Sequence, residues 1–387
     1  MSDKLKLLLV GIGGYGAGYV MTAQNMEDEF EIAGVADPFA KNASSLDSLE
    51  DVPVFDTIED FFAAGLTADA AVISSPIQFH CEQLEAALDH SLHVLCEKPL
   101  CADAGQAQRM LAAAAAHPGQ KVLIGFQWSF SPAMLAFKRQ ILEGKWGRPL
   151  SIKAIVRWPR AFSYYKRNDW AGRLRDSAGR FVGDSVLSNA TAHYLHNPLF
   201  MLGGAMDTAA EPSRIEAQCF RAFDIETFDT AFVKLSVPGR FGNETDVFIA
   251  VSHCTEKVAE PYVEYRFEHG TVLCAGNDRL KGTLRGEEVD FGVIGGGLEG
   301  YYNKMLSLYR CASGLEEPPC TVATSLPELT VANTVLHDFP AVAFNPARVE
   351  ECTAPLKEAR LKVNGLDDVM LECYQKGQLP AQLALQL

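Results

Sequence analysis

Three glycines near the start of the chain have the spacing of a loop that binds a dinucleotide. Gly11, Gly13 and Gly16 form the pattern GxGxxG directly after the apolar run Leu5–Val10. Glycine at these positions permits a tight turn, lets the backbone approach a pyrophosphate and allows a helix to pack closely on the strand. Asp37 ends the next apolar run, 21 residues after Gly16, as this fingerprint requires. A glycine-rich turn followed by an unrelated Asp-Pro turn is the alternative, but the strand–loop–helix context favours nucleotide binding.

Asp37 also bears on which nicotinamide cofactor the chain would take. Its carboxylate would accept hydrogen bonds from the adenosine ribose hydroxyls and repel a 2′-phosphate. Lys41, four residues further on, would instead favour that phosphate. We therefore expect NAD, with NADP as the alternative.

A second set of polar residues follows a later strand. Glu97, Lys98 and Pro99 come directly after the apolar run His93–Cys96. Open α/β sheets bind ligands at the carboxyl ends of their strands. A lysine there can hydrogen-bond a reacting hydroxyl, and Pro99 can fix the turn. On spacing alone, an exposed ion pair at a strand end is an equally good interpretation.

The overall composition argues against several classes of protein. Of 387 residues, 48% are hydrophobic and 21% charged, which is typical of globular domains. The net charge of −15 argues against binding nucleic acid or anionic membrane surfaces, since both are negatively charged. No apolar run approaches the ~18 residues of a membrane span, and the N-terminus lacks a signal-peptide pattern, so we expect a cytoplasmic protein. The ten cysteines lack CxxC spacing and are expected to be reduced structural thiols.

The pattern of strands and helices changes near residue 125. Before it, continuous apolar runs alternate with helical patterns, which predicts a doubly wound parallel sheet covered on both faces. After it, apolar and polar residues alternate, which predicts an antiparallel sheet with one face packed and the other free for a partner. These runs are 150–157, 215–223, 230–237, 246–253 and 262–268, and helices are expected near 131–143, 186–202 and 299–313. We expect one α/β domain over 1–125 and a second, with a large open and mostly antiparallel sheet, over 126–387; the tail from about 350 has no clear pattern.

Five short motifs occur in an order that resembles one protein family. They are VGIGGYG at 10–16, VADP at 35–38, ISSPIQFH at 73–80, HVLCEKPL at 93–100 and GFQWSFSP at 125–132. Together they resemble the Gfo/Idh/MocA oxidoreductases, which include glucose–fructose oxidoreductases and inositol dehydrogenases. The resemblance covers residues 1–205 well and the chain to about 340 more loosely. It implies a Rossmann domain, an α/β domain with an open antiparallel sheet, binding of NAD(H) or NADP(H), and oxidation or reduction of sugars, polyols and their derivatives.

The motifs extend the expected binding residues beyond the glycines. The expected cofactor-binding residues are Gly11, Gly13, Gly14, Tyr15, Gly16, Asp37, Ser74, Ser75, Pro76, His80, Glu97 and Lys98. The expected substrate-binding residues are Lys98, Gln127, Tyr165, Arg167, Trp170, Asn189 and His193.

The catalytic signature of the family is Asp-x-Gly-x-His-x-x-Asp, and this chain departs from it. The aligned segment carries Asn189, Thr191, His193 and His196, so only the first histidine matches. Asn189 can orient groups by hydrogen bonding, but it cannot exchange a proton as a carboxylate does. The resemblance therefore assigns catalysis to Lys98, His193 and Asn189, with Asn189 limited to positioning.

Spacing adds detail to this segment. If it is helical, Asn189, His193 and Asn197 share one face by i,i+4 spacing, with His196 adjacent. Pro198 should kink or end the helix. His193 could instead be a capped or buried histidine, or form a metal pair with His196. No third ligand of suitable spacing is evident in the sequence, so we expect no metal.

The segment 158–180 is rich in aromatic and basic residues although the chain is acidic. It includes Tyr164, Tyr165, Arg167, Asn168, Trp170 and Arg173. Aromatic faces can stack on sugar C–H surfaces, and arginine or asparagine can hydrogen-bond hydroxyls or a carboxylate, which predicts a substrate-facing loop. Single-stranded nucleic acid is bound by the same residue types, but the overall charge argues against it, and a solvated loop remains an alternative. Gln127 and Trp128 are weaker candidates of the same kind.

These residues together predict an NAD-dependent oxidoreductase acting on a sugar, polyol or sugar derivative. Lys98 would hydrogen-bond the reacting oxygen, and His193 would take or return its proton, since imidazole titrates near pH ~6.5. Two alternatives stay open: NAD-dependent, redox-assisted glycoside cleavage, and a nucleotide-binding regulatory protein without turnover, which Asn189 would favour. A homodimer or homotetramer is expected, because the strand 262–268 carries alternating apolar residues that need a second partner layer.

Overall fold

The computed structural model describes residues 4–239, 242–276 and 279–387, and the chain divides into two compact units. The first unit is formed by Met1–Ser131 and Gly295–Leu326, and the second by Pro132–Ile294 and Pro327–Leu387. Sequence alone places a single boundary after residue 125, whereas the structure returns residues 295–326 to the first unit.

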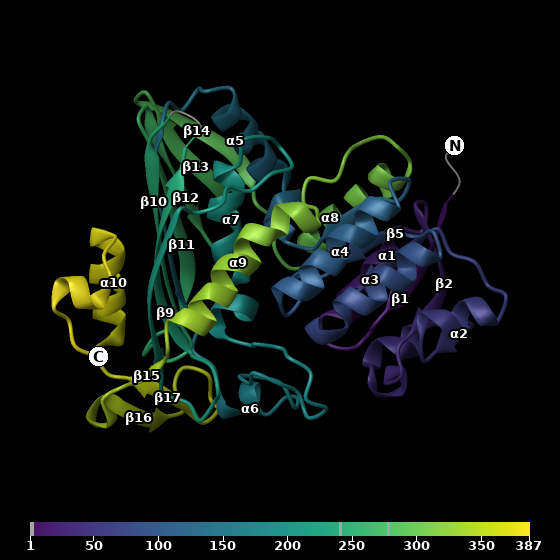
Figure 1. Ribbon diagram of the computed structural model, residues 1–387, viewed down its shortest axis with the longest axis horizontal. Coiled ribbons are helices and arrows are strands. Elements are labelled where there is room, and N and C mark those ends of the chain that lie inside the picture. Colours follow the sequence, from purple (N-terminus) through teal and green to yellow (C-terminus); the bar gives the residue numbers. More distant parts are fainter. Residues whose placement is uncertain (1–3, 240–241, 277–278) are drawn as a thin grey trace. The chain divides into compact units, whose positions relative to one another are not determined.

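The first unit contains a six-stranded parallel sheet (Figure 1). Its strands are β1 (Leu5–Val10), β2 (Phe30–Ala36), β3 (Val54–Phe55), β4 (Ala70–Ile73), β5 (His93–Cys96) and β6 (Val122–Ile124). Their order, β3-β2-β1-β4-β5-β6, is that of dinucleotide-binding folds, and every neighbouring pair is parallel. All of β4 and most of β1 are buried, which accounts for their continuous apolar sequences. The predicted doubly wound sheet is confirmed.

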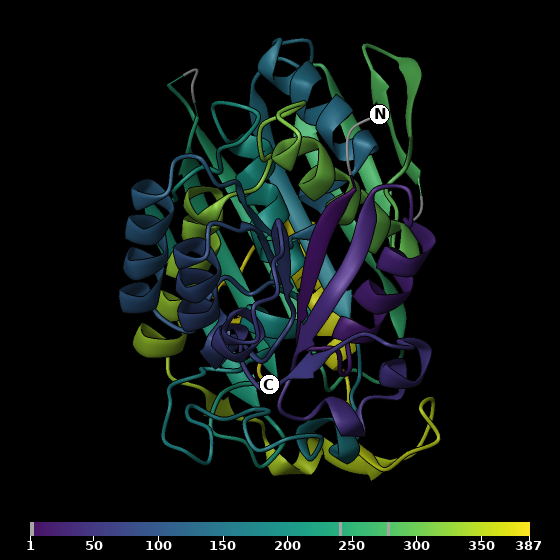
Figure 2. The same ribbon diagram turned by 90° about the vertical axis from the view of Figure 1, so that its right-hand side faces the viewer.

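The strands β1 and β2 pair in parallel and lie side by side in both views (Figures 1 and 2). Four helices of the first unit follow the strands of this sheet. The helices are α1 (Gly16–Asn25), α2 (Ile58–Ala63), α3 (His80–Asp89) and α4 (Ala104–Ala116). The side chains of Thr57 and Asp103 cap α2 and α4 by accepting hydrogen bonds from backbone N–H groups of the first turn. Such caps fix where a helix begins, because the first N–H groups have no partner within the helix.

Helix α8 (Leu298–Ala312) completes the first unit from far along the sequence. It packs against α1 and against the short helix η4 (Gln127–Phe130). Its buried face carries Tyr301, Lys304, Met305 and Leu308. This face is largely apolar, and its burial against the first unit is the physical reason that residues 295–326 group with the nucleotide-binding sheet.

The second unit is built on a nine-stranded sheet. In chain order its strands are β7 (Pro149–Arg157), β8 (Arg214–Arg221), β9 (Thr230–Pro238), β10 (Glu244–Ser252), β11 (Ala259–Phe267), β12 (Gly270–Ala275), β13 (Arg279–Leu284), β14 (Glu287–Val293) and β15 (Val342–Ala343). They lie in the order β14-β13-β12-β11-β7-β10-β9-β8-β15, with two parallel pairs, β7–β10 and β15–β8. The predicted open, mostly antiparallel sheet is confirmed. Because β7 and β10 are parallel neighbours, the residues after both strands meet at one edge.

Helices lie on both faces of this sheet (Figure 1). The helices α5 (Pro132–Leu142) and α7 (Ala192–Leu202) pack on one face, and α10 (Leu366–Lys376) packs against β7 and β10 on the other. Met370 and Cys373 of α10 join a core cluster with Phe232 and Phe248. The face that the sequence predicts to be free for a partner is therefore partly covered by the chain's own C-terminal helix.

Residues 186–202 form two pieces rather than one regular helix. A π-helical turn, η5 (Val186–Ala190), ends at Thr191, whose φ of −112° interrupts the helix before α7 begins. Asn189 thus lies outside α7, and the predicted common face of Asn189 and His193 is wrong. Pro198, which is expected to kink or end the helix, lies inside α7, and the helix continues past it to Leu202. Its neighbours on the helix are buried, and this packing outweighs the one backbone hydrogen bond that a proline removes.

The remaining elements are short, apart from one helix. They are α6 (Phe162–Tyr165), α9 (Val322–Asp338), β16 (Val349–Cys352) and β17 (Arg360–Val363). None of the described helices is long and apolar enough to cross a membrane.

Candidate active site

The glycine loop, residues 11–16, closes tightly on β1. A Cβ on Gly16 would lie 2.3 Å from the carbonyl oxygen of Gly11, so no larger residue fits where α1 meets the strand. At Gly13 and Gly14, in contrast, a Cβ would stand in open space. A loop that is crowded on its inner side and open on its outer side suits the approach of a pyrophosphate to the backbone and to the N-terminus of α1.

Asp37 shapes a pocket beside the glycine loop. Its Oδ2 accepts a hydrogen bond from the N–H of Ile12 at 2.9 Å, and its Oδ1 accepts one from the N–H of Phe39 at 2.8 Å. Each carboxylate oxygen keeps a second lone pair for a ligand hydroxyl. The glycine loop, Asp37 and residues 42–45 line the pocket, whereas the exposed Lys41 is not part of its lining.

His80 ties together the turns that follow β4 and β5. Its Nδ1 lies 2.9 Å from the carbonyl oxygen of Pro99, and its Nε2 lies 2.9 Å from that of Ser75. The ring is buried, and burial lowers its pKa. Ser74 donates a hydrogen bond from Oγ to the glycine loop at 2.6 Å, and Pro76 directly precedes the short helix η3 (Ile77–Phe79). Both ring nitrogens of His80 are occupied by carbonyl oxygens, so this residue positions the two turns.

The buried carboxylate of Glu97 holds the turn that carries Lys98. Its Oε1 accepts hydrogen bonds from Tyr19 Oη and Lys304 Nζ, and its Oε2 accepts one from the N–H of Lys98 at 3.0 Å. Lys304, on α8, is fully buried and forms an ion pair with Glu97. Burial lowers the pKa of Lys304, although the carboxylate opposes this effect. The interpretation of Glu97 and Lys98 as an exposed ion pair is therefore wrong, because Glu97 pairs with Lys304 inside the unit.

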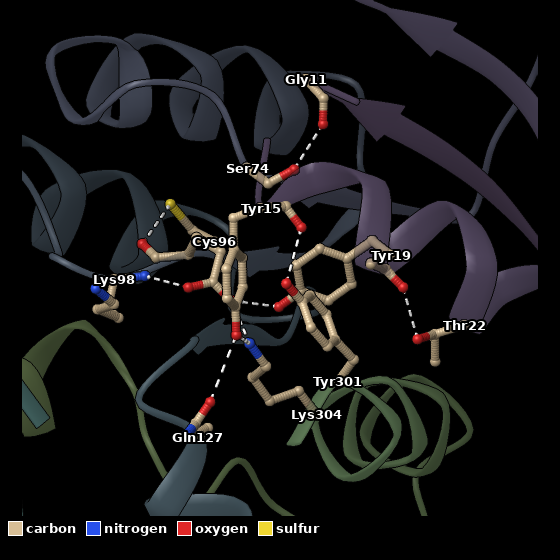
Figure 3. A network of polar contacts seen from close by, with 12 residues as sticks. Gly11, Tyr15, Tyr19, Thr22, Ser74, Cys96, Lys98, Gln127, Tyr301 and Lys304 are labelled. Atoms are coloured by element: carbon tan, nitrogen blue, oxygen red, sulfur yellow. Dashed lines mark hydrogen bonds and ion pairs between the residues drawn. The ribbon is translucent and has the colours of Figure 1, made fainter. Parts of the chain in front are cut away.

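Three tyrosines surround the ammonium group of Lys304 (Figure 3). The ring of Tyr15 stacks on that of Tyr301 with centroids 4.5 Å apart, and Tyr301 Oη donates to the carbonyl oxygen of Tyr15 at 3.0 Å. Tyr15 Oη accepts from Lys304 Nζ at 3.2 Å and donates to Gln127 Oε1 at 3.4 Å. Burial raises the pKa of both tyrosines, so their hydroxyls stay protonated. Gln127 thus contacts the glycine loop, whereas Trp128, the other candidate here, is buried in the core.

In the second unit, Asn189 is bound to a carboxylate. Its Nδ2 donates to Asp184 Oδ1 at 2.7 Å. Asp184 is buried, and its Oδ2 accepts a hydrogen bond from the N–H of Gly172 at 2.6 Å. The asparagine of the predicted catalytic segment therefore has a carboxylate partner five residues earlier in the chain.

The two histidines of α7 have different surroundings. His193 lies in the first turn of α7 and is half-buried. His196 is buried, and burial together with the charge of Lys138 lowers its pKa to about 3, so it stays neutral at physiological pH. Asn197, predicted to share a face with His193, is buried and accepts a hydrogen bond from Tyr265 Oη. Across the described residues, no group of three or more His, Cys, Asp or Glu side chains is placed to hold a metal ion.

The aromatic and basic segment 158–180 continues from the end of β7. Tyr165 Oη lies 2.8 Å from His253 Nδ1. The exposed guanidinium of Arg167 lies 3.8 Å from the ring centroid of Tyr164 and 5.2 Å from that of Trp170. The structure thus groups Tyr165, Arg167 and Trp170 in the second unit with His193 and Asn189, while Lys98 and Gln127 belong to the first.

Comparison with known proteins identifies the nucleotide-binding part. Residues 5–126 match the family model described as "Oxidoreductase family, NAD-binding Rossmann fold". This model is that of the Gfo/Idh/MocA family. The match includes the glycine loop, Asp37 and the turn with Glu97 and Lys98, and the resemblance drawn from the motifs is confirmed.

Relatives of the Gfo/Idh/MocA family match part of the chain in sequence. Inositol 2-dehydrogenase from Corynebacterium glutamicum is 30% identical over 171 residues, which are 43% of this chain and 50% of the relative. The chain thus spans about half the length of this curated relative. Inositol 2-dehydrogenase from Mycolicibacterium gilvum is 28% identical over 245 residues, 61% of this chain and 68% of the relative.

Solved structures match over most of the chain. The WlbA dehydrogenase from Bordetella pertussis, in complex with NADH and UDP-GlcNAcA, has a TM-score of 0.69 at 22% identity and covers 87% of this chain and 96% of its own. An oxidoreductase from Agrobacterium radiobacter, in complex with NAD+, L-tartaric acid and magnesium, has a TM-score of 0.69 at 17% identity and covers 86% and 95%. At such identities these structures establish a common fold.

Sequence reasoning missed several residues that, within each unit, contact the predicted site residues. Lys304 lies 207 residues after Glu97 and belongs to no Gfo/Idh/MocA motif quoted above. One local signal for the packing of α8 is Gly18 of α1, where a Cβ would lie 2.3 Å from the ring of Tyr301. A glycine at this position indicates a close contact, but it does not reveal which side chain makes that contact. Asp184 falls outside the aligned catalytic segment. His253 is the last residue of the predicted strand 246–253 and directly follows β10, so attention to strand ends could have found it.

Proposed function

We propose that this chain is an NAD-dependent dehydrogenase or reductase that moves a hydride between nicotinamide and a hydroxyl or keto carbon of a sugar, polyol or sugar derivative. The observation that carries the proposal is Lys98, set on a turn that a buried carboxylate holds within a Gfo/Idh/MocA domain. The inositol 2-dehydrogenase relatives support the substrate class, since inositol is a cyclic polyol.

The residues of the first unit fit NAD. Gly13 and Gly14 leave open space against the backbone, and Asp37 has lone pairs for the ribose hydroxyls. A 2′-phosphate would meet the charge of Asp37, and Lys41 lies outside the pocket lining, so NAD is preferred to NADP. When bound, the nicotinamide supplies the hydride transfer.

The proposed chemistry of the chain's own residues is proton handling and charge stabilisation. Lys98 hydrogen-bonds the reacting oxygen and stabilises its developing negative charge. His193, half-buried at the start of α7, takes or returns the hydroxyl proton. Asn189, fixed by Asp184, positions neighbouring groups and carries no proton.

The test is a panel of sugars and polyols followed by the absorbance of reduced nicotinamide. On any substrate found, we expect His193→Ala to lower kcat by about 10²–10⁴-fold and Lys98→Ala by about 10²–10³-fold. The affinity for NADH, measured by titration calorimetry, should persist in His193→Ala. The matched control for Lys98→Ala is Lys145→Ala, which removes an exposed lysine. Near-full activity in both catalytic variants would place the chemistry on other residues.

A second candidate function is nucleotide-dependent regulation without turnover. Asn189, where the family has aspartate, is the observation that favours it. It predicts tight NADH binding with no turnover across the panel and no change of turnover in an Asn189→Asp variant.

We also propose that the chain forms a homodimer or homotetramer through the sheet of the second unit. Helix α10 packs on β7 and β10, whereas Leu273 of β12 and Val293 of β14 remain exposed. Light scattering should give a multiple of 42.2 kDa, and a 42.2 kDa particle at micromolar concentration would contradict the proposal.

A further inference from the structure

The carboxyl ends of β7 and β10 bring two chain segments together. The N–H of Trp158 donates to the carbonyl oxygen of Ser252, and the N–H of Arg160 donates to that of His253, both at 3.0 Å. Parallel neighbouring strands end at the same edge, and ligands commonly bind at such carboxyl ends. Residues 158–170 and His253 therefore share one small region of the second unit.

Two arginines in this region are held by aromatic rings instead of carboxylates. The guanidinium groups of Arg160 and Arg167 lie 5.1 and 3.8 Å from the ring centroid of Tyr164. Arg160 also lies 5.7 Å from the Trp158 ring, and Arg167 lies 5.2 Å from the Trp170 ring. Among the described residues, neither arginine has a carboxylate within 4.0 Å. We call Trp158, Arg160, Tyr164, Arg167, Trp170 and His253 the cationic cluster.

Neighbouring arginines of the same segment show the contrast. Arg173 pairs with Glu226 at 3.5 Å, and Arg180 pairs with Asp176 at 2.7 Å. The nearby carboxylate of Asp184 is engaged by Asn189 and a backbone N–H. Within the described part of the chain, Arg160 and Arg167 of the cationic cluster thus form no salt bridge, although the net charge of the protein is −15.

The cluster also contains buried donors that lack acceptors. His253 is 1% exposed, and its Nδ1 lies 2.8 Å from Tyr165 Oη. The described residues offer this hydroxyl no other acceptor, so it donates to Nδ1 and leaves the proton of the neutral ring on Nε2. Burial and the two arginines lower the pKa of His253, which keeps the ring neutral.

No described residue accepts a hydrogen bond from His253 Nε2 or from Arg160 Nε, although both atoms are buried. Buried polar groups are nearly always paired, and each unpaired group costs free energy. The unpaired imidazole N–H of His253 and the two guanidinium groups, one of which carries the unpaired Nε–H of Arg160, are complementary to an acceptor with negative charge.

The cluster lies beside the proposed catalytic helix. The Trp158 ring packs edge-on against Tyr194, the residue after His193, with centroids 5.7 Å apart. A ligand group bound to the cluster would therefore be close to the first turn of α7.

We propose that the cationic cluster binds an anionic group, a carboxylate or a phosphate, of the sugar substrate, so that the protein acts on an acidic sugar or sugar phosphate in preference to a neutral polyol. This inference rests on the proposed function for its link to turnover, but the binding site itself does not depend on turnover. Arginine suits this role because its planar fork can bind both oxygens of such a group.

The experiment compares anionic ligands with their neutral parents. The NADH-loaded protein is titrated by calorimetry with D-glucuronate, D-galacturonate, glucose 6-phosphate and inorganic phosphate, and with D-glucose, D-galactose and myo-inositol. Turnover of each sugar is measured with NAD+. The variants Arg160→Met and Arg167→Met remove the charge and keep a long side chain, and Arg139→Met, at an exposed arginine of α5, is the control with the same charge change.

We expect at least one anionic ligand to bind more tightly than its neutral parent. Each cluster variant should weaken that binding by about tenfold to hundredfold, as for a lost hydrogen bond to a charged group, and should weaken the binding of neutral ligands less. Arg139→Met should leave the binding of the anionic ligands unchanged. Uronates and phosphates compete for one site, and the tighter of them identifies the anionic group.

The outcomes separate this inference from the proposed function. Anion binding that depends on Arg160 and Arg167, without turnover of any sugar, supports the cluster and contradicts the dehydrogenase proposal. Turnover of neutral sugars that exceeds that of every acidic sugar and is unchanged in both variants overturns the inference and keeps the dehydrogenase. Absence of saturable anion binding also overturns it.

Discussion

The buried pair of Lys304 and Glu97 gives a quantitative prediction for the variant Lys304→Met. Methionine keeps a long apolar side chain against Tyr15, Tyr19 and Tyr301 but removes the ammonium group. Removing one partner of a buried ion pair costs about 3–5 kcal/mol, because the other charge is left buried and uncompensated. Tyr19 Oη still donates to Glu97, as does the N–H of Lys98, so we expect the lower end, about 3 kcal/mol.

This loss can be measured by thermal unfolding. For a folding unit of this size each kcal/mol lowers Tm by about 2–4 °C, so Lys304→Met should lower it by about 6–12 °C. The two units can unfold in separate transitions. Saturating NADH should raise the Tm of the first unit, because it binds that unit only when folded, and this shift identifies the transition of the first unit. The matched control is Lys376→Met, which breaks an exposed i,i+4 pair with Glu372 that is worth about 0.3–0.5 kcal/mol.

A double variant tests the physical reason. Glu97→Gln combined with Lys304→Met removes both charges, and a neutral amide can still bind Tyr19. Because the cost arises from the uncompensated carboxylate, the double variant should recover most of the Tm lost in Lys304→Met. The reasoning is refuted if Lys304→Met lowers Tm no more than Lys376→Met, or if the double variant is less stable than the single one.

Three further predictions concern the cofactor, the pH dependence and the catalytic segment. Asp37→Ala should reduce the preference for NAD over NADP in parallel calorimetric titrations at fixed salt; an unchanged preference would show that Asp37 does not select the cofactor. Burial, together with Lys138, holds the pKa of His196 at about 3 in the folded state, against about 6.5 in the unfolded state. Between pH 6.5 and pH 3 the unfolded state therefore binds a proton at His196 that the folded state does not bind. The free energy of unfolding consequently decreases as the pH falls through this range. His196→Leu should remove about 1.4 kcal/mol per pH unit of this slope between pH 6.5 and 5 in urea unfolding, and parallel slopes for the two proteins would contradict the assignment. Asn189→Asp should place a second carboxylate against Asp184, which raises one carboxyl pKa, so the variant should be less stable than the wild type at pH 8 and recover towards pH 5, whereas Asn189→Ala should show no such recovery.

The parts that sequence predicts well are those governed by local patterns. The strand runs around the glycine loop are continuous and apolar because both faces of the sheet are covered, and few architectures besides a covered parallel sheet produce that pattern. The helix α10 was not predicted, but its sequence carries a local pattern that could have indicated it. Its buried apolar residues recur at helical spacing, namely Leu366, Val369, Met370 and Cys373. The irregular sequence from about residue 350 onwards surrounds this helical pattern and makes it harder to recognise.

The remaining features depend on contacts between distant residues or on fine backbone geometry. The partner of Glu97 is chosen by packing across 207 residues, which no local spacing encodes. The π-turn before α7 is fixed by a reciprocal cap between Ser185 and Ser188 and ends at Thr191, details that the helical pattern of 186–202 conceals. The partner of Asn189 follows from that turn, so it too could not be predicted from the signature.

The return of α8 to the first unit has a consequence for the order in which the protein is made. When residue 131 leaves the ribosome the parallel sheet is complete, but the cation that neutralises Glu97 is not yet synthesised. At about 5–20 residues per second, residues up to 326 need about 10–40 s more. Throughout that interval the nascent sheet carries a carboxylate in a site built for an ion pair, and the surface of α1 around Gly18 lies open where Tyr301 will pack. The nucleotide-binding part is thus finished only after the strands β7 to β14 of the nine-stranded sheet have been translated. A fragment ending at residue 131 should depend on chaperones or on a separately supplied α8 segment to stay folded.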